Sequence, residues 1–231
     1  MPAISRRGFF CACAALPLAA AHGAGPPSPG PSPGPTPDQA LDRMVTGNRG
    51  FRIDDPTRPE LSQARRAMLA TSQHPFAAIL GCADSRTPPE ALFRAGLGDI
   101  FTVRIAGNSA TAGSVGSLEY ALEELHVPLI LVMGHERCGA IAAAKHVLDT
   151  GAALPGVLGE LVAPIIPSLI EARASGAADV LDAAVRIHAR RTARRLRDDN
   201  ALITGAVREG KLRVEAAYYS LDDGAVSILP A

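Results

Sequence analysis

The sequence predicts an α/β domain with a mainly parallel β-sheet that is flanked by helices. Residues 76–80 and 128–133 are apolar throughout, which is typical of strands buried on both faces. Elsewhere apolar residues recur every three or four positions, as they do on one face of a helix. Strand and helix patterns therefore alternate along the chain, which favours a parallel sheet.

The first 37 residues are predicted to precede the domain. Arg6-Arg7 is followed by an apolar run that ends near Ala21 and is too short to span a bilayer. We expect residues 1–21 to be an export signal that resembles the bacterial twin-arginine type, with an uncleaved anchor helix as the alternative. Residues 22–37 are rich in Pro, Ser and Gly and are predicted to be a linker. The domain should then cover residues 38–231, in the periplasm or otherwise exported.

The elements of the domain follow in order. Residues 38–52 and 61–70 have helical, amphipathic patterns before the first strand, and we expect them to form an N-terminal helical arm. A second strand is predicted over 100–103 between the two apolar runs, followed by a helix over 115–125 and a longer helical segment over 177–208.

The chain is predicted to end in an antiparallel hairpin at the sheet edge. The β-rich runs 212–219 and 226–229 are separated by Asp223-Gly224, a turn dipeptide that favours a hairpin.

Composition excludes some partners. The 231 residues include 47% hydrophobic residues, enough for a sizeable core, and equal numbers of Lys plus Arg and Asp plus Glu, 23 each. With no Trp and 4% aromatic residues, the chain has few surfaces on which bases could stack, and no nucleic acid is expected as a partner. The arginines of residues 186–197 are interpreted as a solvated helix face. No stable membrane insertion is expected once the signal is removed.

Cysteine and histidine residues follow two of the predicted strands. Cys82 comes after the first strand, and His135 and Cys138 come after the third. The carboxyl ends of parallel strands form the edge where α/β sheets bind ligands. Two sulfurs and one nitrogen suit Zn2+, and three protein ligands would leave a fourth position for catalysis. Because Cys82 and Cys138 are the only cysteines after the signal, a disulfide in an oxidising compartment is the competing interpretation.

The motif Cys82-x-Asp84-x-Arg86, followed by His135-x-x-Cys138, resembles that of the β-class carbonic anhydrases. This resemblance implies a zinc ion held by the two cysteines and the histidine, and a catalytic pair formed by Asp84 and Arg86. In a closed state, Asp84 could become the fourth ligand. The resemblance further implies reversible hydration of CO2 to bicarbonate, an arm that embraces a neighbour, and a homodimer or tetramer.

Other residues match the family more weakly. Gln73, Phe101 and Tyr120 match substrate-binding or wall positions, with Tyr120 expected from the other subunit. The turn at Gly107 and Asn108 could present backbone amides or could simply connect a strand to a helix. The remaining histidines have no cysteine at metal spacing and are expected to be solvent-facing or hydrogen-bonded: His74, His126, His146 and His188.

Two alternative functions stay open at this point. Relatives of the family hydrolyse carbon disulfide or carbonyl sulfide, so a zinc hydrolase on the same fold is one alternative. The other is a non-enzymatic exported binding domain in which Cys82 and Cys138 form a disulfide.

Overall fold

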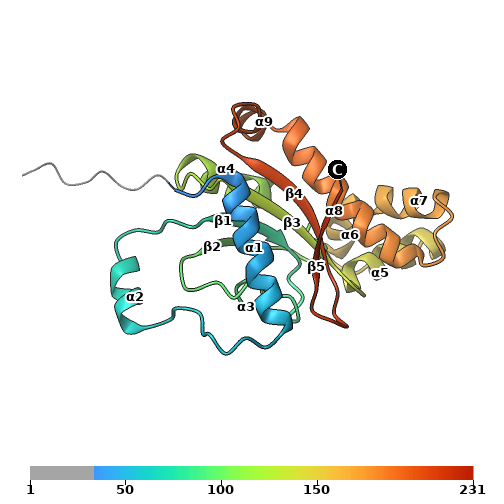
Figure 1. The fold of residues 1–231 in the computed structure, drawn as a ribbon. Coiled ribbons are helices and arrows are strands. Elements are labelled where there is room, and N and C mark those ends of the chain that lie inside the picture. Colours follow the sequence, from blue (N-terminus) through green and yellow to red (C-terminus); the bar gives the residue numbers. More distant parts are fainter. Residues whose placement is uncertain (1–33, 231) are drawn as a thin grey trace, which may run out of the picture. The chain divides into compact units, whose positions relative to one another are not determined.

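A computed structural model describes residues 34–230. Five strands form one sheet in the order β2-β1-β3-β4-β5 (Figure 1). β1 to β4 are parallel and β5 is antiparallel to β4, which confirms the predicted fold class and the terminal hairpin. The strands are β1 (Ala77–Gly81), β2 (Ile100–Arg104), β3 (Leu129–His135), β4 (Arg213–Tyr219) and β5 (Val226–Leu229).

Helices occupy most of the remaining described chain. They are α1 (Pro37–Arg52), α2 (Gln63–Leu69), α3 (Pro89–Leu92), α4 (Ala112–Glu123), α5 (Gly139–Thr150), α6 (Leu158–Val162), the 3-10 helix η1 (Ala163–Ile165), α7 (Ile166–Ala174), α8 (Val180–Asp199) and α9 (Ala201–Arg208). Among the described residues, none of these helices combines the length and apolar character needed to cross a bilayer. The expected signal of residues 1–21 and most of the linker over 22–37 lie outside the described residues.

The sheet separates two hydrophobic cores because successive side chains of a strand point to opposite faces. Ala78 and Leu80 of β1 belong to the core shared with α4, α5, α7, α8 and α9. Ala77 and Ile79 belong to the core shared with α1 and α3. All five residues of β1 and all seven of β3 are buried, as expected for strands covered on both faces.

α1 packs on its own sheet. Its first turn is stabilised by a capping box between Thr36 and Gln39, and it buries Ala40, Leu41 and Met44. α1 crosses the sheet in Figure 1. A Cβ atom at Gly47 would lie 1.9 Å from the Phe93 carbonyl oxygen, so only glycine allows this approach of α1 to the end of α3.

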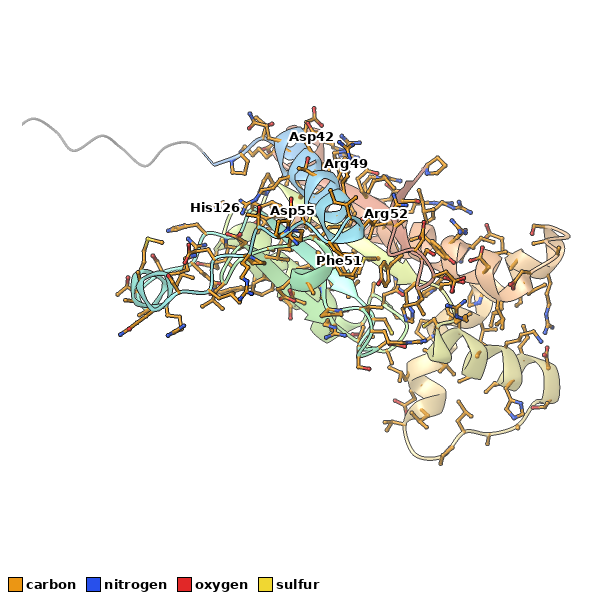
Figure 2. All side chains as sticks on the ribbon, turned by 60° about the horizontal axis from the view of Figure 1, so that its bottom comes forward. Asp42, Arg49, Phe51, Arg52, Asp55 and His126 are labelled. Atoms are coloured by element: carbon orange, nitrogen blue, oxygen red, sulfur yellow. The ribbon has the colours of Figure 1, made fainter. Side chains whose placement is uncertain are left out.

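The end of α1 is fastened to the β4–β5 turn. Asn48 donates to the carbonyls of Leu92 and Gly224 and accepts from the Val226 amide. Arg52 forms an ion pair with Asp223 at 3.2 Å, and Figure 2 shows Phe51 and Arg52 at the carboxyl end of the helix. α2 buries none of its residues in this chain and stands apart from the sheet in Figure 1.

Three features differ from the sequence-based expectation. The predicted helical segment over 177–208 is interrupted at Asn200, whose backbone is extended and whose side chain caps α9 by accepting from the Ile203 amide. His135 is the last residue of β3 rather than the first residue after it. The helices between residues 158 and 174 were not predicted, because they are short and interrupted by Pro164 and Pro167.

Candidate metal centre

The candidate site lies where the strand order reverses. β1 is followed in the chain by β2 on one side of it, whereas β3 lies on its other side. Helices that follow such strands leave on opposite faces, which opens a crevice at the carboxyl ends of β1 and β3. Cys82 follows β1 directly, His135 ends β3, and Cys138 is the N-cap residue of α5. The topology therefore brings both halves of the motif to one place.

The ligand atoms of Cys82, His135 and Cys138 all lie within 4.8 Å of one another, and all three residues are buried. The two sulfurs are 3.9 Å apart, and both cysteines are free. A disulfide needs about 2.05 Å between its sulfurs, whereas two thiolates on a tetrahedral zinc, each about 2.3 Å from the metal, are separated by nearly the distance found here. This geometry fits a metal ion and argues against the disulfide alternative.

His135 is oriented to offer one nitrogen to the cluster. Its Nδ1 lies 2.9 Å from the carbonyl oxygen of Glu136, which can only accept, so Nδ1 carries the proton. Its Nε2 then has a free lone pair, and this buried atom has no hydrogen-bond partner among the described residues. An unpaired buried nitrogen is costly, and a metal ion would satisfy it.

The pKa values of the two thiols are shifted in opposite directions. The pKa of Cys82 is lowered, first because the Cys138 thiol hydrogen-bonds to its sulfur, and further by the amides of Gly107 and Asp84. The pKa of Cys138 is raised, because it shares this hydrogen bond and because it is buried. A thiolate at Cys82 is thus favoured by the protein itself, and a cation between the sulfurs would favour the second.

Asp84 is held beside this cluster by Arg86. Both nitrogens of the guanidinium edge contact the carboxylate, Nε to Oδ1 at 2.9 Å and Nη2 to Oδ2 at 2.8 Å, and the Arg86 amide donates to Oδ1. The Arg86 hydrogen bond holds the pKa of Asp84 well below its ordinary value. Oδ2 lies 3.9 Å from His135 Nε2, so the carboxylate borders the cluster while it pairs with Arg86.

Hydrogen bonds from Arg104, Thr87 and Gly107 fix the loop that carries Cys82 and Asp84. Arg104, at the end of β2, donates to the Cys82 carbonyl at 2.9 Å and to the Asp84 carbonyl at 2.5 Å. The Thr87 hydroxyl donates to the Asp84 carbonyl at 3.0 Å. The Gly107 amide donates to Cys82 Sγ at 3.3 Å. The turn at Gly107 therefore presents an amide, which was one of the two interpretations left open by the sequence.

Glu136, which lies between His135 and Cys138, connects this segment to the β4–β5 turn. Its carboxylate accepts from the Leu221 amide at 2.8 Å and from the Ser220 hydroxyl at 3.3 Å. Its own amide donates to the Tyr219 carbonyl. These contacts position Glu136, whose carbonyl accepts the hydrogen bond that orients the His135 ring. Sequence reasoning missed both Glu136 and Arg104 as supporting residues, because their partners lie on other strands or turns.

The predicted wall residues separate into two groups. Phe101 and Tyr120 contact each other, with ring centroids 6.1 Å apart, and Tyr120 is 49% exposed. Gln73 lines a cleft of about 590 Å³ with residues of α2 and the segment before β2, and none of the metal-cluster residues lines it. Within one chain the structure therefore does not join Gln73 to the cluster, and the role of these three residues stays a prediction.

Fold and site together define an α/β protein with a candidate catalytic metal centre at the carboxyl edge of its parallel strands. The carbonic anhydrase family model matches residues 77–226. Over 181 residues the chain is 38% identical to carbonic anhydrase 2 of Mycobacterium tuberculosis, covering 78% of this chain and 87% of that protein. A carbonic anhydrase of Mycolicibacterium smegmatis is 36% identical over 185 residues, covering 80% and 89%. The chain belongs to the β-class carbonic anhydrase family.

Solved structures support the same fold. The β-carbonic anhydrase CcaA matches with a TM-score of 0.65 at 23% identity, covering 82% of this chain and 95% of that one. Tetrameric β-carbonic anhydrases from Sordaria macrospora match with a TM-score of 0.64 at 22% identity, covering 83% and 94%.

Proposed function

We propose that this protein is a zinc enzyme that reversibly hydrates CO2 to bicarbonate and a proton. The observation that carries the proposal is the buried cluster of Cys82, His135 and Cys138, with the paired carboxylate of Asp84 at its border. Membership of the carbonic anhydrase family supports the substrate. Cys82 Sγ, Cys138 Sγ and His135 Nε2 would hold the metal, which when bound would supply a Lewis acid that makes water nucleophilic near neutral pH.

Asp84 would orient the attacking water. Its carboxylate stays ionised far into the acid range, because Arg86 holds its pKa low, and it can therefore accept a hydrogen bond throughout the working range. When Asp84 accepts a hydrogen bond from an O–H group of the water, a lone pair of the water oxygen is left free to face the carbon of CO2. Arg86 keeps the carboxylate in this position through its two parallel hydrogen bonds.

The proposal is tested by stopped-flow CO2 hydration with purified protein, together with its zinc content. We expect about one zinc per chain and hydration well above the buffer rate, both lost in Cys82→Ser, because a hydroxyl replaces a thiolate ligand. Zinc-free protein with no hydration activity would contradict the proposal. Zinc-loaded protein that hydrolyses carbonyl sulfide and leaves CO2 untouched would favour the hydrolase alternative.

We also propose export before function, on the strength of Arg6-Arg7 and the short apolar run that follows. A chain exported in the folded state could acquire its metal in the reducing cytoplasm, before its thiols meet oxidants. Replacing both arginines with Lys should leave the protein inside a bacterial host, as measured by fractionation. Unchanged export of that variant would contradict this route.

A further inference from the structure

A buried histidine outside the metal cluster has no part in the proposed reaction. His188 of α8 is 3% exposed, and both nitrogens of its ring are hydrogen-bonded. Nε2 lies 3.1 Å from the hydroxyl of Ser109, in the turn after β2, and Nδ1 lies 3.2 Å from the hydroxyl of Ser168 on α7. Both serines are fully buried. Three buried polar groups joined in this way require an explanation.

The direction of each hydrogen bond follows from the Gly107 carbonyl, which is the last acceptor in this series of contacts. The Ser109 hydroxyl lies 3.5 Å from the Gly107 carbonyl, which can only accept, so the hydroxyl donates to it. Ser109 Oγ then accepts from His188 Nε2–H, and Nδ1 accepts from Ser168. Burial lowers the pKa of His188 to about 4, against the opposing effect of the Gly107 carbonyl and with a smaller contribution from Arg191. The ring is therefore neutral near pH 7, as this arrangement requires.

The same turn reaches a metal ligand. Gly107 accepts from Ser109 through its carbonyl and donates through its amide to Cys82 Sγ. Gly107 and Asn108 both have left-handed backbone conformations, with φ of 76° and 45°. A non-glycine residue in that region costs free energy and persists when its surroundings hold it. The contacts to Ser109 supply this restraint from α8.

We propose that His188 is a positioning residue of the metal centre. Its neutral ring holds the 107–109 turn so that the Gly107 amide stays on the Cys82 thiolate. This inference rests on the proposed zinc site. A hydrogen bond to a ligand atom orients it and stabilises its charged form, and loss of such a supporting contact weakens metal binding about 10-fold to 100-fold.

Two variants break the contact at different points. His188→Leu removes both ring nitrogens, and Ser109→Ala removes the hydroxyl that joins the ring to the turn. Zinc affinity is measured by competition with a chelator, and we expect both variants to bind zinc about tenfold more weakly. In protein loaded with Co2+, the thiolate-to-metal charge-transfer band should move to lower energy, because a thiolate without the amide hydrogen bond gives up an electron more easily.

Two further variants separate positioning from packing. His188→Gln keeps one donor and one acceptor and should restore zinc affinity and the cobalt band. Thr192→Val removes a buried hydroxyl one turn further along α8, and no described hydrogen bond joins that side chain to the turn. This control should bind zinc as the wild type does.

Each outcome bears on a different statement. Wild-type zinc affinity and an unshifted cobalt band in both His188→Leu and Ser109→Ala would overturn the role of His188. A wild-type protein that binds no zinc would instead overturn the proposed metal site. Should His188→Leu fail to fold, Ser109→Ala, which loses a single hydroxyl, decides the question by the same two measurements.

Discussion

Arg86 shows how much the site depends on the shape of one side chain. Its planar guanidinium contacts both oxygens of Asp84, while it is itself half exposed. A surface ion pair of this kind contributes little to stability. Its value lies in the fixed orientation that two parallel hydrogen bonds give to the carboxylate.

We therefore expect Arg86→Lys to lower kcat for CO2 hydration about tenfold or more and to leave zinc content unchanged. Lysine keeps the positive charge but offers a single ammonium group instead of the two-pronged edge that orients Asp84. Stopped-flow kinetics and metal analysis on the same sample measure both quantities. A kcat equal to that of the wild type would show that charge alone is sufficient.

His188 makes stability depend on pH. Burial lowers its pKa from 6.5 to about 4, so between these values the unfolded chain binds a proton that the folded chain does not. Above pH 6.5 the imidazole is neutral in both the folded and the unfolded chain, and the free energy of unfolding is unaffected. As the pH falls from 6.5 towards 4, protonation of the unfolded chain lowers the free energy of unfolding. Because one pKa unit corresponds to about 1.4 kcal/mol, we expect a loss of about 2 kcal/mol between pH 8 and pH 5.

This loss is measured by urea unfolding of the wild type and of His188→Gln at both pH values. The glutamine variant does not titrate there, so the free energy of unfolding should fall less in the variant than in the wild type. Titration of carboxylates and release of metal contribute to both proteins, and the difference between them isolates the imidazole. An equal decrease in the two proteins would place the pKa of His188 near its ordinary value.

At the scale of elements, the turn between β2 and α4 tolerates little change at Gly107. Gly107 has a φ of 76°, and a Cβ atom there would lie 2.7 Å from Ile165 Cδ1 and 3.1 Å from Ala140 Cβ. Both the backbone conformation and the packing against η1 and α5 therefore require glycine. The same residue supplies the amide that contacts Cys82.

We expect Gly107→Ala to destabilise the protein by about 2–4 kcal/mol, the sum of a left-handed alanine and local overpacking. The matched control is Gly113→Ala in α4, where a Cβ atom would contact nothing and where φ is not positive. That substitution should stabilise by up to about 1 kcal/mol, because alanine favours the helix. Urea unfolding compares the two, and a Gly107→Ala protein as stable as its control would contradict this account.

At the scale of the whole molecule, some surfaces suggest an assembly. α2 buries none of its residues within the chain, and Tyr120 is about half exposed beside Phe101. We propose a homodimer or tetramer in which Tyr120 contacts the other subunit. The resemblance to the β-class carbonic anhydrases implies both the assembly and this role of Tyr120. The structures matched from Sordaria macrospora are described as tetrameric.

Light scattering on purified protein should give a dimer or tetramer, and Tyr120→Arg should shift it towards smaller species with lower activity. A charged side chain placed in an apolar interface loses its hydration without a partner. Leu202→Arg on α9 is the control, because Leu202 is 47% exposed, much like Tyr120. A monomeric wild type, or equal effects of the two substitutions, would argue against an interface at Tyr120.

Sequence alone determined the five strands in their chain order and the residues of the metal cluster, but not the short helices between residues 158 and 174. Cys82, His135 and Cys138 could be predicted together because each directly follows or ends a strand, and parallel strands bring their carboxyl ends to one edge. Asp84 and Arg86 were paired through the resemblance to the β-class carbonic anhydrases, since their spacing alone is equally typical of a surface ion pair.

Tertiary structure decided what supports the cluster. His188 meets Ser109 across 79 positions of sequence, and Glu136 meets Ser220 across 84. No local pattern distinguishes these residues from an ordinary buried histidine or an exposed glutamate. Their contacts depend on how α8 and the β4–β5 turn pack against the sheet, and that packing is set by the two cores as wholes, because each buried side chain contacts many others at once.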